Sequence, residues 1–130
     1  MNRIIILNGE LETQMQLYLS LCDNYRVEIA EDEAQLMRMI RRKKPELIFL
    51  DADFSGFSVA GKSLPKMILK LKKKYQELKI ITISNAESAL SLRNKETNGS
   101  DRILIRPFDE DAIQQSVTQQ FRQNQVAVNS

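Results

Sequence analysis

The chain has 130 residues, of which 42% are hydrophobic and 28% charged, a composition that predicts one soluble globular domain with little room for a second. Its formal net charge of +2 is too small to indicate nucleic-acid binding, and no apolar stretch approaches the length of a membrane span. The chain has no histidine, which excludes His-based catalytic triads and argues against a dedicated transition-metal site. A single cysteine, Cys22, excludes an internal disulfide, and the N-terminus has no signal-peptide pattern. We therefore expect a cytoplasmic protein.

Five short runs rich in β-branched and apolar residues predict five strands. They cover residues 4–7, 26–29, 47–50, 80–83 and 103–105. Four of the runs are continuously apolar or nearly so, as expected of strands covered on both faces of a parallel sheet. The run at 26–29 alternates between polar and apolar residues, which favours a strand at the edge of the sheet.

Amphipathic segments lie between and after these runs and predict helices. Their apolar stripes are Leu11, Met15, Tyr18, Leu19 and Cys22 in the first; Leu36, Met37 and Ile40 in the second; Leu64, Ile68, Leu71 and Tyr75 in the third; and Ile113, Val117 and Phe121 in the last. The first stripe predicts a buried, unreactive thiol for Cys22. A weaker apolar face predicts one more helix between residues 86 and 95.

The last predicted helix has a recognisable start. Asp109 can cap its first turn, and Phe108 can pack onto Ile113. The chain becomes polar after Gln119, so we expect a domain over residues 1–123 and a frayed tail over residues 124–130.

Two basic runs, residues 41–44 and 72–74, fall at the ends of predicted helices. Cations there offset the negative end of the helix macrodipole, which is the simplest reason for them. The alternative is a docking patch for an acidic partner.

Strict alternation of strands and helices predicts a doubly wound α/β fold with a five-stranded parallel sheet in the order 2-1-3-4-5. In this architecture the ligand site lies beyond the carboxyl ends of the strands. The residues that follow the inner strands are Asn8, Asp51, Ser84 and Arg106. We therefore expect these four side chains to share one crevice.

Asp51 is the centre of this predicted crevice. A carboxylate at that place can attack a phosphoryl donor and form an acyl phosphate. The Ser84 hydroxyl can hydrogen-bond a phosphoryl oxygen, and Arg106 supplies a fixed positive charge for the developing anion. A purely structural alternative is that Arg106 forms an ion pair with Asp51 and holds the site closed, which would mimic the state with a phosphoryl group bound.

Four motifs, in order and spacing, cover nearly the whole chain. They are IIILNGE (residues 4–10), LIFLDADFSG (47–56), ITISNAES (81–88) and GSDRILIRPF (99–108). Together they resemble the receiver domain of two-component response regulators, which has the flavodoxin-like fold. The resemblance implies that Asp51 is the phosphoacceptor, that Ser84 is the switch hydroxyl and that Arg106 replaces the family's lysine. It also implies a histidine kinase or phosphotransfer protein as partner, and leaves a homodimer through the last helices open.

The metal site of the family is altered in this sequence. Receivers usually carry two acidic residues after the first strand, which help to hold Mg²⁺, and here those positions are Asn8 and Gly9. Losing two carboxylates weakens Mg²⁺ binding. The remaining candidate ligands are Asp51, Asp53 and Glu10.

Other departures affect the switch and the turn. Arginine at position 106 replaces a compact ammonium with a planar fork. Ile103 stands where the family usually has an aromatic switch residue. The turn after Asp51 has Ser55 where proline is usual and is longer before Gly61.

Three functions are compatible with these residues. The first is a stand-alone receiver that accepts a phosphoryl group on Asp51 and acts through protein contacts, with no enzymatic activity beyond phosphorylation and dephosphorylation of itself. The second is a pseudo-receiver, a binding module that needs no phosphorylation. The third is a phosphatase, because LIFLDADFS also resembles the first motif of haloacid-dehalogenase-type enzymes, with Asp51 as nucleophile and Asp53 as acid-base. A flavin site is disfavoured, because the loop at residues 8–13 carries acids where a phosphate cradle needs hydroxyls and glycines.

Overall fold

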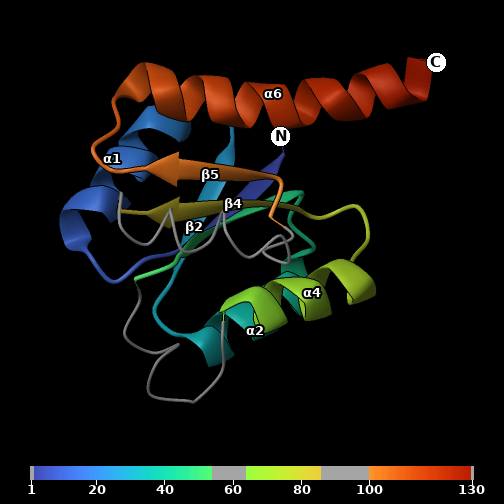
Figure 1. Ribbon diagram of the computed structural model, residues 1–130, viewed down its shortest axis with the longest axis horizontal. Helices are drawn as coiled ribbons and strands as arrows, with labels where there is room; N and C mark the ends of the chain where they lie inside the picture. Colours follow the sequence, from blue (N-terminus) through green and yellow to red (C-terminus); the bar gives the residue numbers. More distant parts are fainter. Residues whose placement is uncertain (1, 54–63, 86–99, 130) are drawn as a thin grey trace.

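Five strands form one parallel sheet in the computed structural model of the chain (Figure 1). They are β1 (Arg3–Leu7), β2 (Arg26–Ala30), β3 (Leu47–Asp51), β4 (Lys79–Ser84) and β5 (Arg102–Ile105). The described helices are α1 (Leu11–Leu21), α2 (Glu33–Lys43), α4 (Leu64–Lys74) and α6 (Glu110–Asn129). The structure describes residues 2–53, 64–85 and 100–129, with side chains as far as residue 122. The helix predicted at 86–95 and the turn positions Ser55 and Gly61 lie outside these residues.

The strand order is β2-β1-β3-β4-β5, which confirms the predicted doubly wound sheet. β1 lies between β2 and β3, pairing Ile5 with Glu28 on one side and with Ile48 on the other. β2 is an edge strand with half-exposed residues, as its alternating sequence predicted. This order brings the carboxyl ends of β1, β3, β4 and β5 to one edge.

Helices cover both faces of the sheet (Figure 1): α2 and α4 pack on one face, and α1 and α6 on the other. Successive strand residues face opposite sides, so Ile48 and Leu50 join the core under α2 and α4, whereas Leu47 and Phe49 join the core under α1 and α6. All five residues of β3 are buried. This double burial is why the inner strands read as continuous apolar runs.

The predicted apolar stripe of α1 is wrong. Leu17 and Leu21 face the core, whereas Leu11, Met15 and Leu19 are 70%, 46% and 63% exposed. Apolar residues lie on two faces of this helix, so its sequence alone does not define which face is buried. Contacts with the sheet and with α6 determine which face is buried. The other two members of the predicted stripe are also exposed to solvent. Tyr18 is 38% exposed, and Cys22 is a partly exposed residue at the end of α1 instead of a core thiol.

Local hydrogen bonds fix the helix ends. Asp109 Oδ1 accepts a hydrogen bond from Ala112 N at 2.8 Å, which confirms the predicted cap of α6, and Phe108 packs partly buried in the same core as Ile113. α6 continues to Asn129 and so covers residues 124–129 of the tail expected to be frayed, while residue 130 lies outside the described residues. The domain limit at residue 123 stays a prediction.

None of the helices within the described ranges is both long and apolar enough to cross a lipid bilayer.

Candidate functional site

The carboxyl edge of the sheet brings the predicted site residues together around Asp51. Asp51 is the last residue of β3, lies opposite Ile83 of β4, and is 3% exposed. Asn8 follows β1 and is 2% exposed, while Ser84 ends β4 and is fully buried. The spacing argument placed all of these residues at one edge because parallel strands end together there.

Arg106 holds the two aspartates of the site. Its Nη2 lies 3.2 Å from Asp51 Oδ2, and its Nη1 lies 3.2 Å from Asp53 Oδ2. The backbone N–H of Arg106 donates to Ser84 O at 2.8 Å, which extends the β4–β5 ladder by one bond beyond β5. The sheet therefore fixes the backbone of Arg106, the two carboxylates hold its guanidinium, and the guanidinium neutralises one of two adjacent negative charges.

Two backbone groups also bind the Asp51 carboxylate. Asp53 N donates to Oδ1 at 2.9 Å, and Gly9 N donates to Oδ2 at 3.4 Å. A buried carboxylate is stable only when hydrogen bonds or opposite charges replace its lost hydration. Here the two N–H groups and Arg106 do so.

Asn8 and Glu10 shape the loop beside Asp51. Asn8 Oδ1 accepts a hydrogen bond from Glu10 N at 2.7 Å, while Asn8 Nδ2 has no acceptor among the described residues. The Glu10 carboxylate accepts from Thr13 Oγ1 at 2.7 Å, within the first turn of α1. Glu10 is therefore engaged with its own helix.

Ser84 and Ile103 are near the site but do not act on Asp51 in this state. Ser84 Oγ donates to the carbonyl of Asn85 at 2.8 Å. Ile103 is partly buried against the core under α2 and α4. Sequence reasoning missed Asn85, whose N–H donates to Asp53 Oδ2 at 3.3 Å, although its position directly after β4 was a usable signal.

The side chains that could hold the Mg²⁺ ion implied by the family resemblance are engaged with other groups of the chain. Mg²⁺ needs several oxygen ligands in octahedral geometry. In the described part of the chain, no group of three or more His, Cys, Asp or Glu side chains is arranged to hold a metal ion. Asp51 and Asp53 each form an ion pair with Arg106 through Oδ2, and the Glu10 carboxylate accepts a hydrogen bond from Thr13. The three candidate ligands are therefore not assembled, because a guanidinium already occupies the two nearest carboxylates.

The arrangement also gives no support to a phosphatase. A haloacid-dehalogenase-type enzyme would use Asp53 to exchange a proton with the substrate. Here Asp53 is ion-paired with Arg106 and accepts a hydrogen bond from Asn85 N.

Comparison with known proteins identifies a family. The model of the response regulator receiver domain matches residues 8–118. The sensory transduction protein LytT of Bacillus subtilis (strain 168) is 30% identical over 133 residues, covering 100% of this chain and 52% of that protein. The chain thus spans about half the length of this relative.

Solved structures show the same fold at low identity. NtrX from Brucella abortus has a TM-score of 0.82 at 19% identity, over 99% of this chain and 29% of that one. The receiver domain of a response regulator from Bacteroides fragilis has a TM-score of 0.76 at 19% identity, over 92% and 96% of the two chains. With the fold, the strand-end residues and the family match in agreement, the chain belongs to the response regulator receiver family.

Proposed function

We propose that this chain is a receiver module of two-component signalling that accepts a phosphoryl group on Asp51 and acts through protein contacts. Two buried donors on residues of the site support the proposal: Asn8 precedes Gly9, whose N–H binds Asp51, and Arg106 pairs with Asp51 through Nη2. Asn8 Nδ2 and Arg106 Nε are buried and have no acceptor among the described residues. Buried donors without a partner are rare because each loses its hydration without compensation. A phosphoryl group would bring three acceptor oxygens to them.

The chemistry proposed is a single displacement. An oxygen of the Asp51 carboxylate attacks the phosphorus of a phosphohistidine on a histidine kinase or phosphotransfer protein. The new O–P bond forms, the N–P bond breaks, and the leaving imidazole takes up a proton. Arg106, 3.2 Å from Asp51, stabilises the negative charge on the phosphoryl oxygens.

The phosphoryl donor needs a surface next to Asp51, and α1 offers one. Its exposed apolar side chains, Leu11, Met15 and Leu19, begin two residues after Gly9, whose N–H binds Asp51. A contiguous apolar patch on an otherwise polar surface is typical of a protein contact. We assign this face of α1 to the phosphoryl donor.

The ion pairs of Arg106 favour a second candidate function. A site in which one guanidinium already joins Asp51 and Asp53 has a stable arrangement without a phosphoryl group. In this second function, the protein is a pseudo-receiver that binds its partner constitutively.

Intact mass after incubation with acetyl phosphate separates the two functions. The wild type is expected to gain about 80 Da, both with Mg²⁺ and with EDTA, because Arg106 and not a metal supplies the charge. Asp51→Ala should gain nothing, and Asp53→Asn, the matched control, should still be modified. A wild type that stays unmodified under both conditions would overturn phosphorylation at Asp51 and leave the pseudo-receiver.

A further inference from the structure

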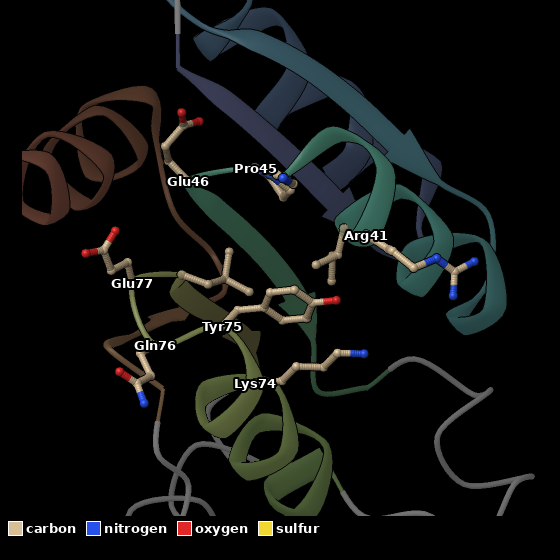
Figure 2. Close-up of a pocket in the computed structure, with 10 residues that line it drawn as sticks. Arg41, Pro45, Glu46, Lys74, Tyr75, Gln76 and Glu77 are labelled. Carbon is tan, nitrogen blue, oxygen red and sulfur yellow. The ribbon is translucent and has the colours of Figure 1, made fainter.

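A second site lies at the opposite edge of the sheet from Asp51. An open cavity of about 800 Å³ is formed where α2 and α4 end and the chain enters β3 and β4 (Figure 2). Pro45 and Glu46 directly precede β3, and Gln76, Glu77 and Leu78 precede β4. Ligand pockets of about 300–1,000 Å³ hold small molecules or a few residues of a peptide. The cavity is large enough for such a segment and too small for a folded domain.

The cavity has an apolar floor with an aromatic ring across it. Ile40 and Leu78 are 1% and 4% exposed, and Pro45 is buried. Tyr75 is half-buried, and Figure 2 shows its ring between Arg41 of α2 and Lys74 of α4. Because Ile40, Leu78 and Pro45 are covered by the chain, Tyr75 is the apolar side chain that a ligand can contact here.

Three of the cations that line this cavity have no ion-pair partner among the residues that the structure describes. Two neighbouring cations, Lys43 and Lys72, are paired with Glu28 and Asp101 at 2.9 and 2.6 Å. Within the described ranges, by contrast, no ion pair involves Arg41, Lys44 or Lys74. Lys74 Nζ lies 5.5 Å from the centroid of the Tyr75 ring. These three charges remain available to an anion.

The acidic residues of the cavity stand apart from the cations. In Figure 2, Glu46 and Glu77 lie on the side away from the head groups of Arg41 and Lys74. Glu46 Oε2 also accepts a hydrogen bond from Arg3 N at 2.6 Å. The cavity thus has a positive side and a negative side, which disfavours a uniform polyanion and favours a ligand of mixed charge.

The backbone at Lys44 supports a role beyond charge balance at a helix end. Lys44 caps α2 with φ 48°, in the left-handed region where glycine is favoured. Arg41, Arg42 and Lys43 already place cations in the last turn of α2. Glycine would suit this conformation better, so lysine at position 44 is retained at a conformational cost.

We propose that this cavity binds a short peptide segment of a partner protein that is mainly acidic and carries one cation, so that carboxylates meet the positive side of the cavity and the cation meets its negative side. An apolar side chain of the segment packs on the accessible part of Tyr75, and its carboxylates face Arg41, Lys44 and Lys74. The site is separate from Asp51 and does not depend on phosphorylation.

Fluorescence anisotropy with a defined probe tests the proposal. The probe is a fluorescein-labelled hexapeptide with one lysine, one leucine and four glutamates, in that order. The double variant Arg41→Ala/Lys74→Ala should weaken binding about fivefold, as expected for the loss of two solvent-screened charge contacts. The matched control, Arg38→Ala/Lys70→Ala, removes two exposed cations of the same helices that do not line the cavity. It should weaken binding less than about twofold.

Several outcomes would overturn the proposal. They are equal losses in the two double variants, no binding by the wild type at millimolar peptide, or a thymidine hexanucleotide that binds as tightly with the same dependence on Arg41 and Lys74. Asp51→Ala should bind the peptide as the wild type does, so failure here and failure of phosphorylation are distinguishable.

Lys44→Gly separates a ligand role from a structural one. Glycine relieves the left-handed strain, so the melting temperature should rise by about 3 °C, while peptide binding should weaken about twofold. A variant that gains stability and keeps full affinity would remove Lys44 from the site.

Discussion

At the carboxyl edge of the sheet, the charge of Asp51 is buried and is met by Arg106 and two backbone N–H groups, whereas at the amino edge Arg41, Lys44 and Lys74 line an open cavity. The same sheet supports both arrangements. A charge that has lost its hydration must be compensated inside the chain, but a cation that keeps its water needs no partner. The two edges should therefore respond very differently to loss of a charge.

The largest effect is expected for Arg106→Ala. It leaves the buried Asp51 carboxylate with only two backbone donors, so the free energy of unfolding should fall by about 3 kcal/mol. Urea unfolding followed by circular dichroism measures this, with Arg38→Ala on the exposed face of α2 as control. Adding Asp51→Asn to Arg106→Ala should restore part of the loss. A loss equal to that of Arg38→Ala would mean that the buried charge is not held by Arg106.

Asp101 tests whether compensation of a partly buried polar group, and not the edge itself, decides the effect. It lies at the amino edge, but Oδ2 accepts from Ile80 N at 2.8 Å and from Lys72 Nζ at 2.6 Å. Asp101→Ala removes both bonds and leaves a partly buried backbone N–H without its acceptor. The expected loss is about 2 kcal/mol in the same unfolding experiment. Glu77→Ala, an acid nearby for which no such bond to a partly buried N–H is found among the described residues, is the control; a similar loss in both variants would contradict the role of the Ile80 N–H.

Asp109 isolates a local hydrogen bond from charge pairing. Asp109→Ala removes the cap on Ala112 N and should lower the free energy of unfolding by about 1 kcal/mol. Asp109→Asn keeps an acceptor and should retain most of the stability, which thermal unfolding can measure. If Asn and Ala behaved alike, the charge and not the hydrogen bond would be the stabilising element.

The smallest effect is expected at the cavity. Arg41→Ala and Lys74→Ala should each change the free energy of unfolding by less than about 0.5 kcal/mol, because both side chains are exposed. Losses near those of Arg106→Ala would show that the cavity cations are structural, and the contrast between the two edges would disappear.

The fold was predictable because burial on both faces leaves a clear mark on the inner strands. The continuous apolar runs around Ile48 and Ile81 identified a parallel sheet, and the strand ends then identified Asp51, Ser84 and Arg106. The pairing of Arg106 with Asp51 was weighed from the sequence. Its second bond, to Asp53, was not, because it depends on side-chain conformations that strand-end positions do not define.

Two features were beyond the sequence for a physical reason. The buried side of α1 depends on which of two apolar faces meets the sheet, and that choice is made by tertiary packing. The cavity arises only when the ends of α2 and α4 come together, so the runs at 41–44 and 72–74 appeared as separate helix ends. Patterns local to one helix do not report contacts between two.

The hydrogen bond from Arg106 N to Ser84 O ties the positive charge of the site to the polypeptide backbone. A dissolved ion can enter or leave a cluster of oxygens without moving the polypeptide. This charge is carried by Arg106, whose backbone belongs to the hydrogen-bonded ladder between β4 and β5. Asp109, three residues later, caps the first turn of α6. A new anion near Asp51 therefore meets a positive charge that can turn about the bonds of its side chain but cannot leave the chain that leads into α6.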